Sequence, residues 1–195
     1  MDYEAGPIID SFNVVVRFNR FRIKGFETKV GTKTTDWITV DSGTQWLNGK
    51  VDECYASDPR VIDSLNNIYI VIPKFKFQHE VDRISRIPNM NPKVQIIDSS
   101  VEDLINDTVD FKPAWPTTGL IAIKLFSTLY DELYIHGFDG HDKKYQDYHY
   151  FDKNDDKRTT KYAWRQNRAD HNLVKEQEFL SMLPKDKVKI LSEFL

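Results

Sequence analysis

Short apolar runs alternate with helical patterns along most of this 195-residue chain. The runs are rich in β-branched and aromatic residues and too short for stable helices, so each predicts a buried strand. These predicted strands cover residues 12–18, 37–40, 68–72, 94–97 and 132–138. Helical patterns predict helices that begin at Ser100, that span 118–130 and that span 171–183 before Pro184.

Strands that alternate with helices are typical of an α/β fold, here a Rossmann-like three-layer α/β/α domain with a mainly parallel sheet. The chain is long enough for one core and too short for two comfortable domains, so a single domain over 1–195 is expected. The polar stretch 139–168 lacks periodicity and is longer than most loops, which indicates a functional or mobile segment.

Charge and cysteine content narrow the choice of partners and compartment. A net charge of -3 excludes broad electrostatic attraction to nucleic acid, so any anion site must be local. The single cysteine, Cys54, cannot form an intrachain disulfide. With no apolar run of about 18 residues and no signal-like start, we expect a cytoplasmic protein without a membrane segment. A location in the Golgi lumen is expected only if the chain is a fragment of an anchored protein.

Four blocks in a fixed order carry the candidate chemistry. They are residues 10–35, residues 115–138, the block Tyr148-His149-Tyr150-Phe151-Asp152, and His171 with Glu176. In this order they resemble the large, small, third and very small motifs of the eukaryotic-type sialyltransferase family. The resemblance covers about residues 6–176 and implies a sialyltransferase-like variant of the GT-A-type fold.

Three features of the chain depart from the family pattern: a missing first strand and two substituted residues. The family's large motif opens with an apolar strand and a Gly-Asn turn, so that first strand is expected to be missing before residue 6. Tyr130 stands where the small motif of animal members carries a disulfide-bonded cysteine. Phe151 replaces a family tyrosine, which removes a hydroxyl from the third motif.

The resemblance implies an inverting glycosyltransferase. It would move sialic acid, or a related acidic sugar, from its CMP ester to a glycan hydroxyl, with the CMP-sugar as co-substrate and no cofactor. Metal independence is expected, because the chain contains no Asp-x-Asp and one phosphate can be neutralised by hydrogen bonds and a helix terminus. Asp139, His141 and Asp142 are compatible with a metal site, but a polar loop is the preferred interpretation.

Candidate donor-binding residues lie in the first two blocks. Thr117, Thr118 and Gly119 precede or open a helix whose N-terminus would face an anion; an ordinary capped helix is the alternative. Asn19 matches the asparagine that the family uses against the nucleotide, although a strand-end Asn that caps a turn would look the same. Arg17, on the same strand face, is compatible with an anion ligand or, more conservatively, with a carboxylate partner.

The last two blocks would carry the proton transfers. By resemblance, His171 is the general base that takes the acceptor proton, and imidazole titrates in the range that this task requires. His149 would donate a hydrogen bond to the departing phosphate, and Tyr150 beside it is expected on the donor side. Glu176 is interpreted as a supporting residue that orients loops or as a solvated acid.

Two other functions are weaker candidates. A catalytically weak or inactive CMP- or glycan-binding relic of the same fold would explain the missing first strand and Phe151. An unrelated α/β nucleotide hydrolase has little support. Residues 31–35 (GTKTT) do not form a phosphate-binding P-loop, because the earlier glycine of that motif is replaced by Phe26. They are expected to shape a turn.

Overall fold

The computed structural model describes residues 4–19, 21–40, 64–72, 78–79, 81–82, 92–138 and 171–194. The chain forms two compact units, Asp2–Asp103 and Leu104–Leu195. The expectation of a single domain over 1–195 stays a prediction.

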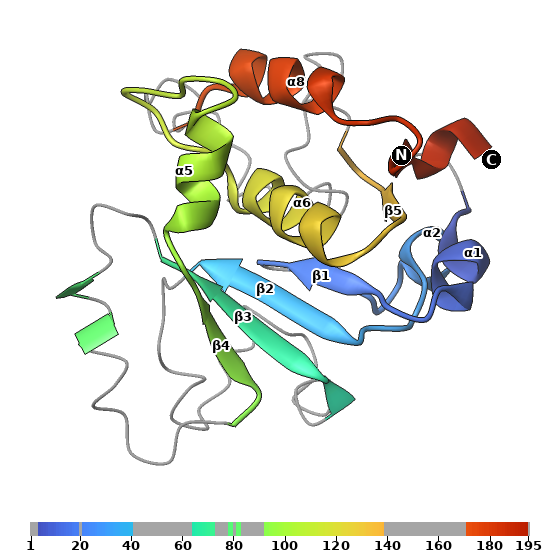
Figure 1. Cartoon of the computed structure of the whole chain (residues 1–195). Helices are drawn as coiled ribbons and strands as arrows, with labels where there is room; N and C mark the ends of the chain where they lie inside the picture. The colour runs from blue at the N-terminus through green and yellow to red at the C-terminus, as the bar shows by residue number, and fades with distance from the viewer. Residues whose placement is uncertain are drawn as a thin grey trace, which may run out of the picture. The chain divides into compact units, whose positions relative to one another are not determined.

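A parallel sheet of four strands, in the order β1-β2-β3-β4, is the centre of the first unit (Figure 1). The strands are β1 (Val16–Phe18), β2 (Asp36–Val40), β3 (Asn67–Val71) and β4 (Val94–Ile97). Every pairing between the described strands is parallel, in this sheet and in the two-stranded sheet of the second unit. The α/β class predicted from the sequence is therefore confirmed.

The two inner strands supply much of the core of this unit. Ile38 on β2 and Ile68 and Ile70 on β3 are 0% exposed, and Trp37 is 1% exposed. Continuous burial of this kind is typical of a parallel sheet that is covered on both faces. Removing one such side chain from water is worth about 1.5–3 kcal/mol.

A row of polar side chains fixes the register at the amino end of the sheet. Asn67 on β3 donates to Asp36 on β2 over 2.7 Å, and Gln95 on β4 donates to Asn67 over 2.7 Å. Asp36 is only 4% exposed, and Thr35 donates a further hydrogen bond to it over 2.6 Å. A one-residue slip would break each of these bonds, so the opposite, carboxyl ends of the strands are aligned as well.

Strand β1 is shorter than the predicted run 12–18 because a side chain replaces part of the ladder. The hydroxyl of Thr35, which donates its hydrogen to Asp36, accepts from the Val15 N–H over 2.8 Å. Two short helices, α1 (Gly6–Ser11) and α2 (Glu27–Val30), flank the strand in sequence and contact each other (Figure 1). Four to six residues are too few to produce a helical pattern, so neither helix was predicted.

Residues 31–35 form a turn that is held by Asp10. The carboxylate of Asp10 accepts from the N–H groups of Thr32 and Lys33, each over 2.8 Å, and from the Thr32 hydroxyl over 2.8 Å. Gly31 has a φ of 71°, and a Cβ at this position would collide with Asp10. The prediction that this segment shapes a turn is therefore confirmed.

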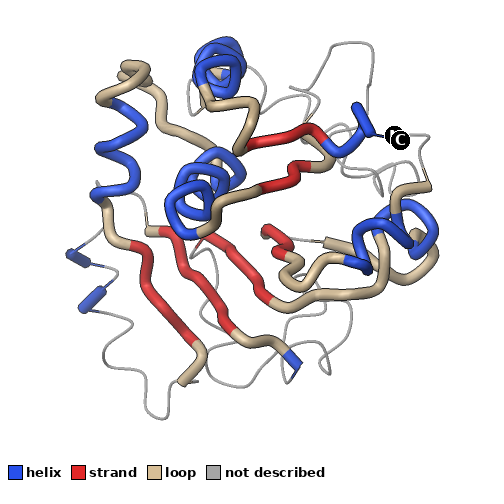
Figure 2. Tube along the Cα trace, turned by 45° about the vertical axis from the view of Figure 1, so that its right-hand side comes forward, coloured by secondary structure: helices blue, strands red, loops and turns tan. Residues whose placement is uncertain are grey.

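The second unit is built from a helix, a two-stranded parallel sheet and a second helix (Figure 2). These elements are α6 (Thr118–Leu129), β5 (Leu133–Ile135), α8 (Leu173–Met182), β6 (Val188–Ile190) and the 3₁₀ helix η4 (Leu191–Phe194). Ile123, Ile135 and Val188 form its core, against which Phe138 and Leu180 pack. Helix α5 (Ser100–Asn106), predicted to begin at Ser100, contains the boundary between the units. No helix of the described residues is long and apolar enough to cross a membrane.

The turn around Asp10 generates a test of stability against pH. Partial burial acts to raise the pKa of Asp10, but the hydrogen bonds from Lys33 and Thr32, with nearby Arg17, outweigh it and lower the pKa. The stabilisation by the carboxylate is therefore present at neutral pH and is lost as pH falls through the lowered pKa. Asp10→Asn should lower the free energy of unfolding by about 1 kcal/mol at neutral pH. At acid pH, below that lowered pKa, the variant and the parent should converge.

Urea unfolding at both pH values measures this difference. Asp107→Asn, at an exposed position, is the matched change of charge and should have little effect. A deficit in Asp10→Asn that persists at acid pH would show that the carboxylate does not stabilise the turn.

Candidate functional site

The start of helix α6 is the first part of the candidate site. Thr117 is its N-cap residue: the Thr117 hydroxyl accepts from the Leu120 N–H over 3.3 Å, and the Thr117 C=O accepts from the Ile121 N–H over 3.1 Å. Its extended backbone, with φ of -68° and ψ of 161°, is typical of an N-cap. The chain therefore changes at Thr117 from the segment Trp115-Pro116 into a helix of three turns.

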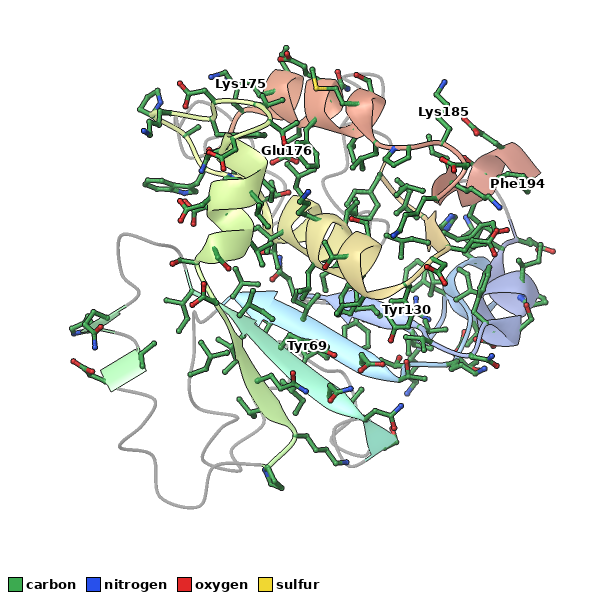
Figure 3. All side chains as sticks on the ribbon, viewed as in Figure 1. Tyr69, Tyr130, Lys175, Glu176, Lys185 and Phe194 are labelled. Atoms are coloured by element: carbon green, nitrogen blue, oxygen red, sulfur yellow. The ribbon has the colours of Figure 1, made fainter. Side chains whose placement is uncertain are left out.

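The start of helix α8 is the second part. Asn172 caps this helix by accepting from the Lys175 N–H over 3.2 Å, so the helix begins at Leu173. His171 lies just before the cap, and Glu176 lies in the first helical turn (Figure 3). The five-residue spacing thus joins a residue outside the helix to one inside it.

Glu176 holds the start of α6. One carboxylate oxygen accepts from the Thr117 N–H over 2.8 Å, and the other accepts from the Thr117 hydroxyl over 2.9 Å. Burial raises the pKa of Glu176, although the bonds from Thr117 and the proximity of His171 act to lower it. A buried carboxylate without these donors would be far more costly. Glu176 is therefore a partly buried carboxylate that holds Thr117, not a solvated acid, and its supporting role in a reaction stays a prediction.

His171 contacts the same segment two residues earlier. Its Nδ1 lies 2.9 Å from the C=O of Trp115. Because a carbonyl can only accept, Nδ1 carries the hydrogen, and the neutral ring then has its lone pair on Nε2. The side chain is exposed, so Nε2 is accessible to a proton donor. His171 and Glu176 therefore both hydrogen-bond to the segment 115–117.

The first N–H groups of α6 are the anion-facing part of this arrangement. For the N–H groups of Thr118 and Gly119, no acceptor occurs within the described parts of the chain. Such groups, together with the helix dipole, favour an anion. The side chain of Thr118 is buried, at 6% exposure. A Cβ at Gly119 would lie 2.7 Å from the ring of Phe138, so glycine at this position leaves room for that ring.

Asn19 and Arg17 belong to the first unit. Asn19 follows β1 with a φ of 46°, a left-handed conformation. It therefore lies at the carboxyl end of a parallel strand, the end where α/β proteins bind ligands. Arg17 donates to the carbonyls of Val30 and Lys33 over 2.5 and 3.0 Å. It thus holds the turn through backbone carbonyls, and its charge also acts on the nearby Asp10 carboxylate and helps to lower the pKa of Asp10.

Several predicted positions lie outside the described residues. They are His149, Tyr150, Phe151, the possible metal group at 139–142, and Cys54. Tyr130 is 40% exposed at the C-cap of α6, where its ring stacks on Phe126 with a centroid distance of 6.1 Å. Within the described segments, no three His, Cys, Asp or Glu side chains are grouped as metal ligands would be.

Three contributors to the site were not predicted. Asn172 caps helix α8, the carbonyl of Trp115 orients His171, and the ring of Phe138 packs at Gly119. An Asn before an amphipathic segment is a recognised signal for the start of a helix, so the cap at Asn172 could have been predicted from the sequence. The role of Trp115 could not have been predicted, because it depends on a backbone carbonyl, which every residue has.

The double role of Thr117 generates a stability test. Thr117→Val keeps the shape of the side chain but removes the N-cap acceptor and the hydroxyl donor to Glu176. We expect a loss of about 1–2 kcal/mol in the free energy of unfolding. Thr117→Ser keeps the hydroxyl and should lose much less. Urea denaturation of both variants measures this, and equal losses would contradict the role of the hydroxyl.

Solved structures and curated proteins provide the comparison. The crystal structure of a mammalian sialyltransferase matches 96% of this chain and 63% of that chain, with a TM-score of 0.60 and 22% identity, which shows a shared fold. A CMP-N-acetylneuraminate-beta-1,4-galactoside alpha-2,3-sialyltransferase of Homo sapiens is 28% identical over 94% of this chain and 52% of its own length. A lactosylceramide alpha-2,3-sialyltransferase of Rattus norvegicus is 28% identical over 95% and 51%. The chain spans about half the length of these relatives.

The comparison corrects one expectation. The related sialyltransferases are Golgi-lumenal enzymes, so the cytoplasmic location expected from the sequence is wrong. That expectation relied on a single cysteine and on the lack of an apolar segment. Neither is informative for a chain that corresponds to about half of each relative.

Residues 2–188 match the family described as Glycosyltransferase family 29 (sialyltransferase). This range contains all four blocks that resemble the sialyltransferase motifs. It also contains both helix starts that form the candidate site. The chain therefore belongs to glycosyltransferase family 29, the sialyltransferases.

Proposed function

We propose that this chain transfers sialic acid, or a related acidic sugar, from its CMP ester to a glycan hydroxyl, with inversion and without a metal ion. The observation that carries the proposal is the hydrogen bond between His171 and the Trp115 carbonyl, two residues before the start of α6. It orients a base beside a helix terminus that can receive a phosphate. Membership of the family supplies the class of donor.

His171 is the general base of the proposed reaction. Nε2 takes the proton of the acceptor hydroxyl while the acceptor oxygen bonds to the anomeric carbon of the donor sugar. The bond from that carbon to the phosphate oxygen breaks, and CMP leaves with the electron pair. Attack from the face opposite to CMP inverts the configuration. The Nδ1–H bond to Trp115 keeps the ring in the required tautomer and orientation.

The donor is bound by groups that suit a single phosphate. The N–H groups of Thr118 and Gly119 at the start of α6 would interact with the phosphate, and Thr117 and Glu176 hold that start in place. Asn19 contacts the nucleotide. His149 and Tyr150, assigned from the sequence resemblance, complete the donor side, where His149 donates to the departing phosphate. One phosphate carries less charge than the diphosphates for which many transferases use a metal.

The acceptor is proposed by analogy with the relatives. The curated names specify beta-1,4-galactoside and lactosylceramide acceptors, and a second solved sialyltransferase, with a TM-score of 0.56, is in complex with Gal-beta-1-3GalNAc-ortho-nitrophenol. A terminal galactoside is therefore the acceptor to assay first.

Donor selectivity is the first test of this function. Titration calorimetry should show that CMP binds more tightly than UMP or GDP, and a chelator should not change the affinity or the rate of transfer. With CMP-N-acetylneuraminate and lactose, CMP should be released together with a sialylated product. Equal affinity for the three nucleotides, or a strict requirement for magnesium, would contradict the proposal.

A substitution at His171 separates chemistry from binding. In His171→Asn the side-chain amide occupies the place of Nδ1–H and can still donate to the Trp115 carbonyl, but it offers no base at the position of Nε2. Transfer should fall by about 10²–10⁴ while CMP affinity stays within a few-fold. His79→Asn, at an exposed position of the first unit, is the control. Normal turnover of His171→Asn would remove the base assignment, and CMP binding without transfer by the parent chain would favour the binding relic.

A further inference from the structure

The backbone of Asn19 has an unusual conformation. With a φ of 46°, it is the one non-glycine residue with positive φ among the described residues. This left-handed region is unfavourable for residues with a Cβ, and Asn is among the types that tolerate it best. Such conformations persist where the surroundings hold them, and they concentrate at functional sites.

Two neighbouring residues of β2 hold Asn19 by its backbone. The Asn19 N–H donates to the C=O of Ile38 over 2.8 Å. The Asn19 C=O accepts from the indole Nε1–H of Trp37, also over 2.8 Å. Both polar groups of the Asn19 main chain are thus bonded to β2, and one of these bonds depends on a side chain.

Trp37 is built into the core. It is 1% exposed, and the ring of Phe21 packs edge-on against it with a centroid distance of 6.5 Å. In the register of the sheet Trp37 lies beside Arg17, so its side chain reaches two residues forward to the carbonyl that follows the end of β1. A buried indole N–H needs an acceptor, and here that acceptor is Asn19. The ring therefore cannot change position without breaking this bond.

We propose that Trp37 is a positioning residue for the donor nucleotide. Its indole N–H, together with the Ile38 carbonyl, holds Asn19 in the left-handed conformation from which the Asn19 side chain binds CMP. This inference rests on the proposed function, in which Asn19 contacts the nucleotide. Trp37 itself does not touch the ligand, and it acts through the backbone of Asn19.

A double-mutant cycle tests the coupling by calorimetric titration of CMP. Trp37→Phe keeps an aromatic ring but removes the indole donor, so CMP affinity should fall by about three- to tenfold, the range that corresponds to one neutral hydrogen bond. The KM for the donor should rise accordingly, while the KM for the acceptor stays unchanged. Asn19→Gly should weaken CMP binding by removing the amide. In that background Trp37→Phe should have no further effect, because glycine adopts positive φ unaided and has no side chain to position.

Two further variants of the chain separate the loss of the hydrogen bond from a general disturbance of the core. Ile70→Val in β3, at a site that is 0% exposed, loses a methyl group from the same core and should keep the CMP affinity of the parent. If Trp37→Phe does not fold, benzothienylalanine at position 37 replaces the indole N–H by sulfur with the same shape.

Each outcome is decisive. Unchanged CMP affinity in Trp37→Phe or in the sulfur analogue would overturn the inference. The same loss with and without the Asn19 side chain would also overturn it, because the effect would then not pass through Asn19. Failure of the parent chain to bind CMP would instead overturn the proposed function, and the inference with it.

Discussion

The two hydrogen bonds from Thr117 to Glu176 fix the start of helix α6, where the candidate site lies. A partly buried carboxylate must be matched by donors, and here both donors belong to the N-cap residue of α6. Thr117 uses the same hydroxyl to cap that helix, so the helix start and the carboxylate are fixed together. Burial raises the pKa of Glu176, which means that ionisation lowers stability. As pH rises through the raised pKa the folded state loses part of its stability, and the bonds from Thr117 limit this loss.

Main-chain groups orient the important side chains in both units. In the second unit, a backbone carbonyl selects the tautomer of His171, and a backbone N–H contributes to holding Glu176. In the first unit, Asp10 accepts from two backbone N–H groups, and Arg17 donates to two backbone carbonyls of the same turn. Main-chain geometry changes little from sequence to sequence, so this arrangement can keep a site in place while the surrounding residues vary.

The sequence predicted the long and strongly patterned elements well. Strands β2, β3 and β4 and helices α6 and α8 lie within one or two residues of their predicted bounds, because burial on both faces or along one stripe produces a clear pattern. Helices α1 and α2 were missed because four to six residues are too few for a helical stripe, and β6 was missed because its three residues contain no continuous apolar run. The shortening of β1 depends on a hydroxyl of Thr35 that is twenty residues away in sequence. No local pattern reports such a bond.

The sequence predicted only part of the candidate site, because contacts between residues far apart along the chain leave no local pattern. Motif resemblance identified His171, Glu176 and the start of α6, but the pairing of Glu176 with Thr117 spans 59 residues and became visible only in the fold. Arg17 was expected to bind an anion or a carboxylate. Its charge does act on the Asp10 carboxylate, but it also donates to two backbone carbonyls, which residue types do not reveal.

The central claim is that CMP binds at the start of α6. Backbone ¹H–¹⁵N spectra recorded during a CMP titration test this most directly, because they report on each amide separately. We expect saturable shifts of the amides of Thr118 and Gly119, with one dissociation constant common to both. Shifts confined to other residues, or no saturable shift at either amide, would contradict the account.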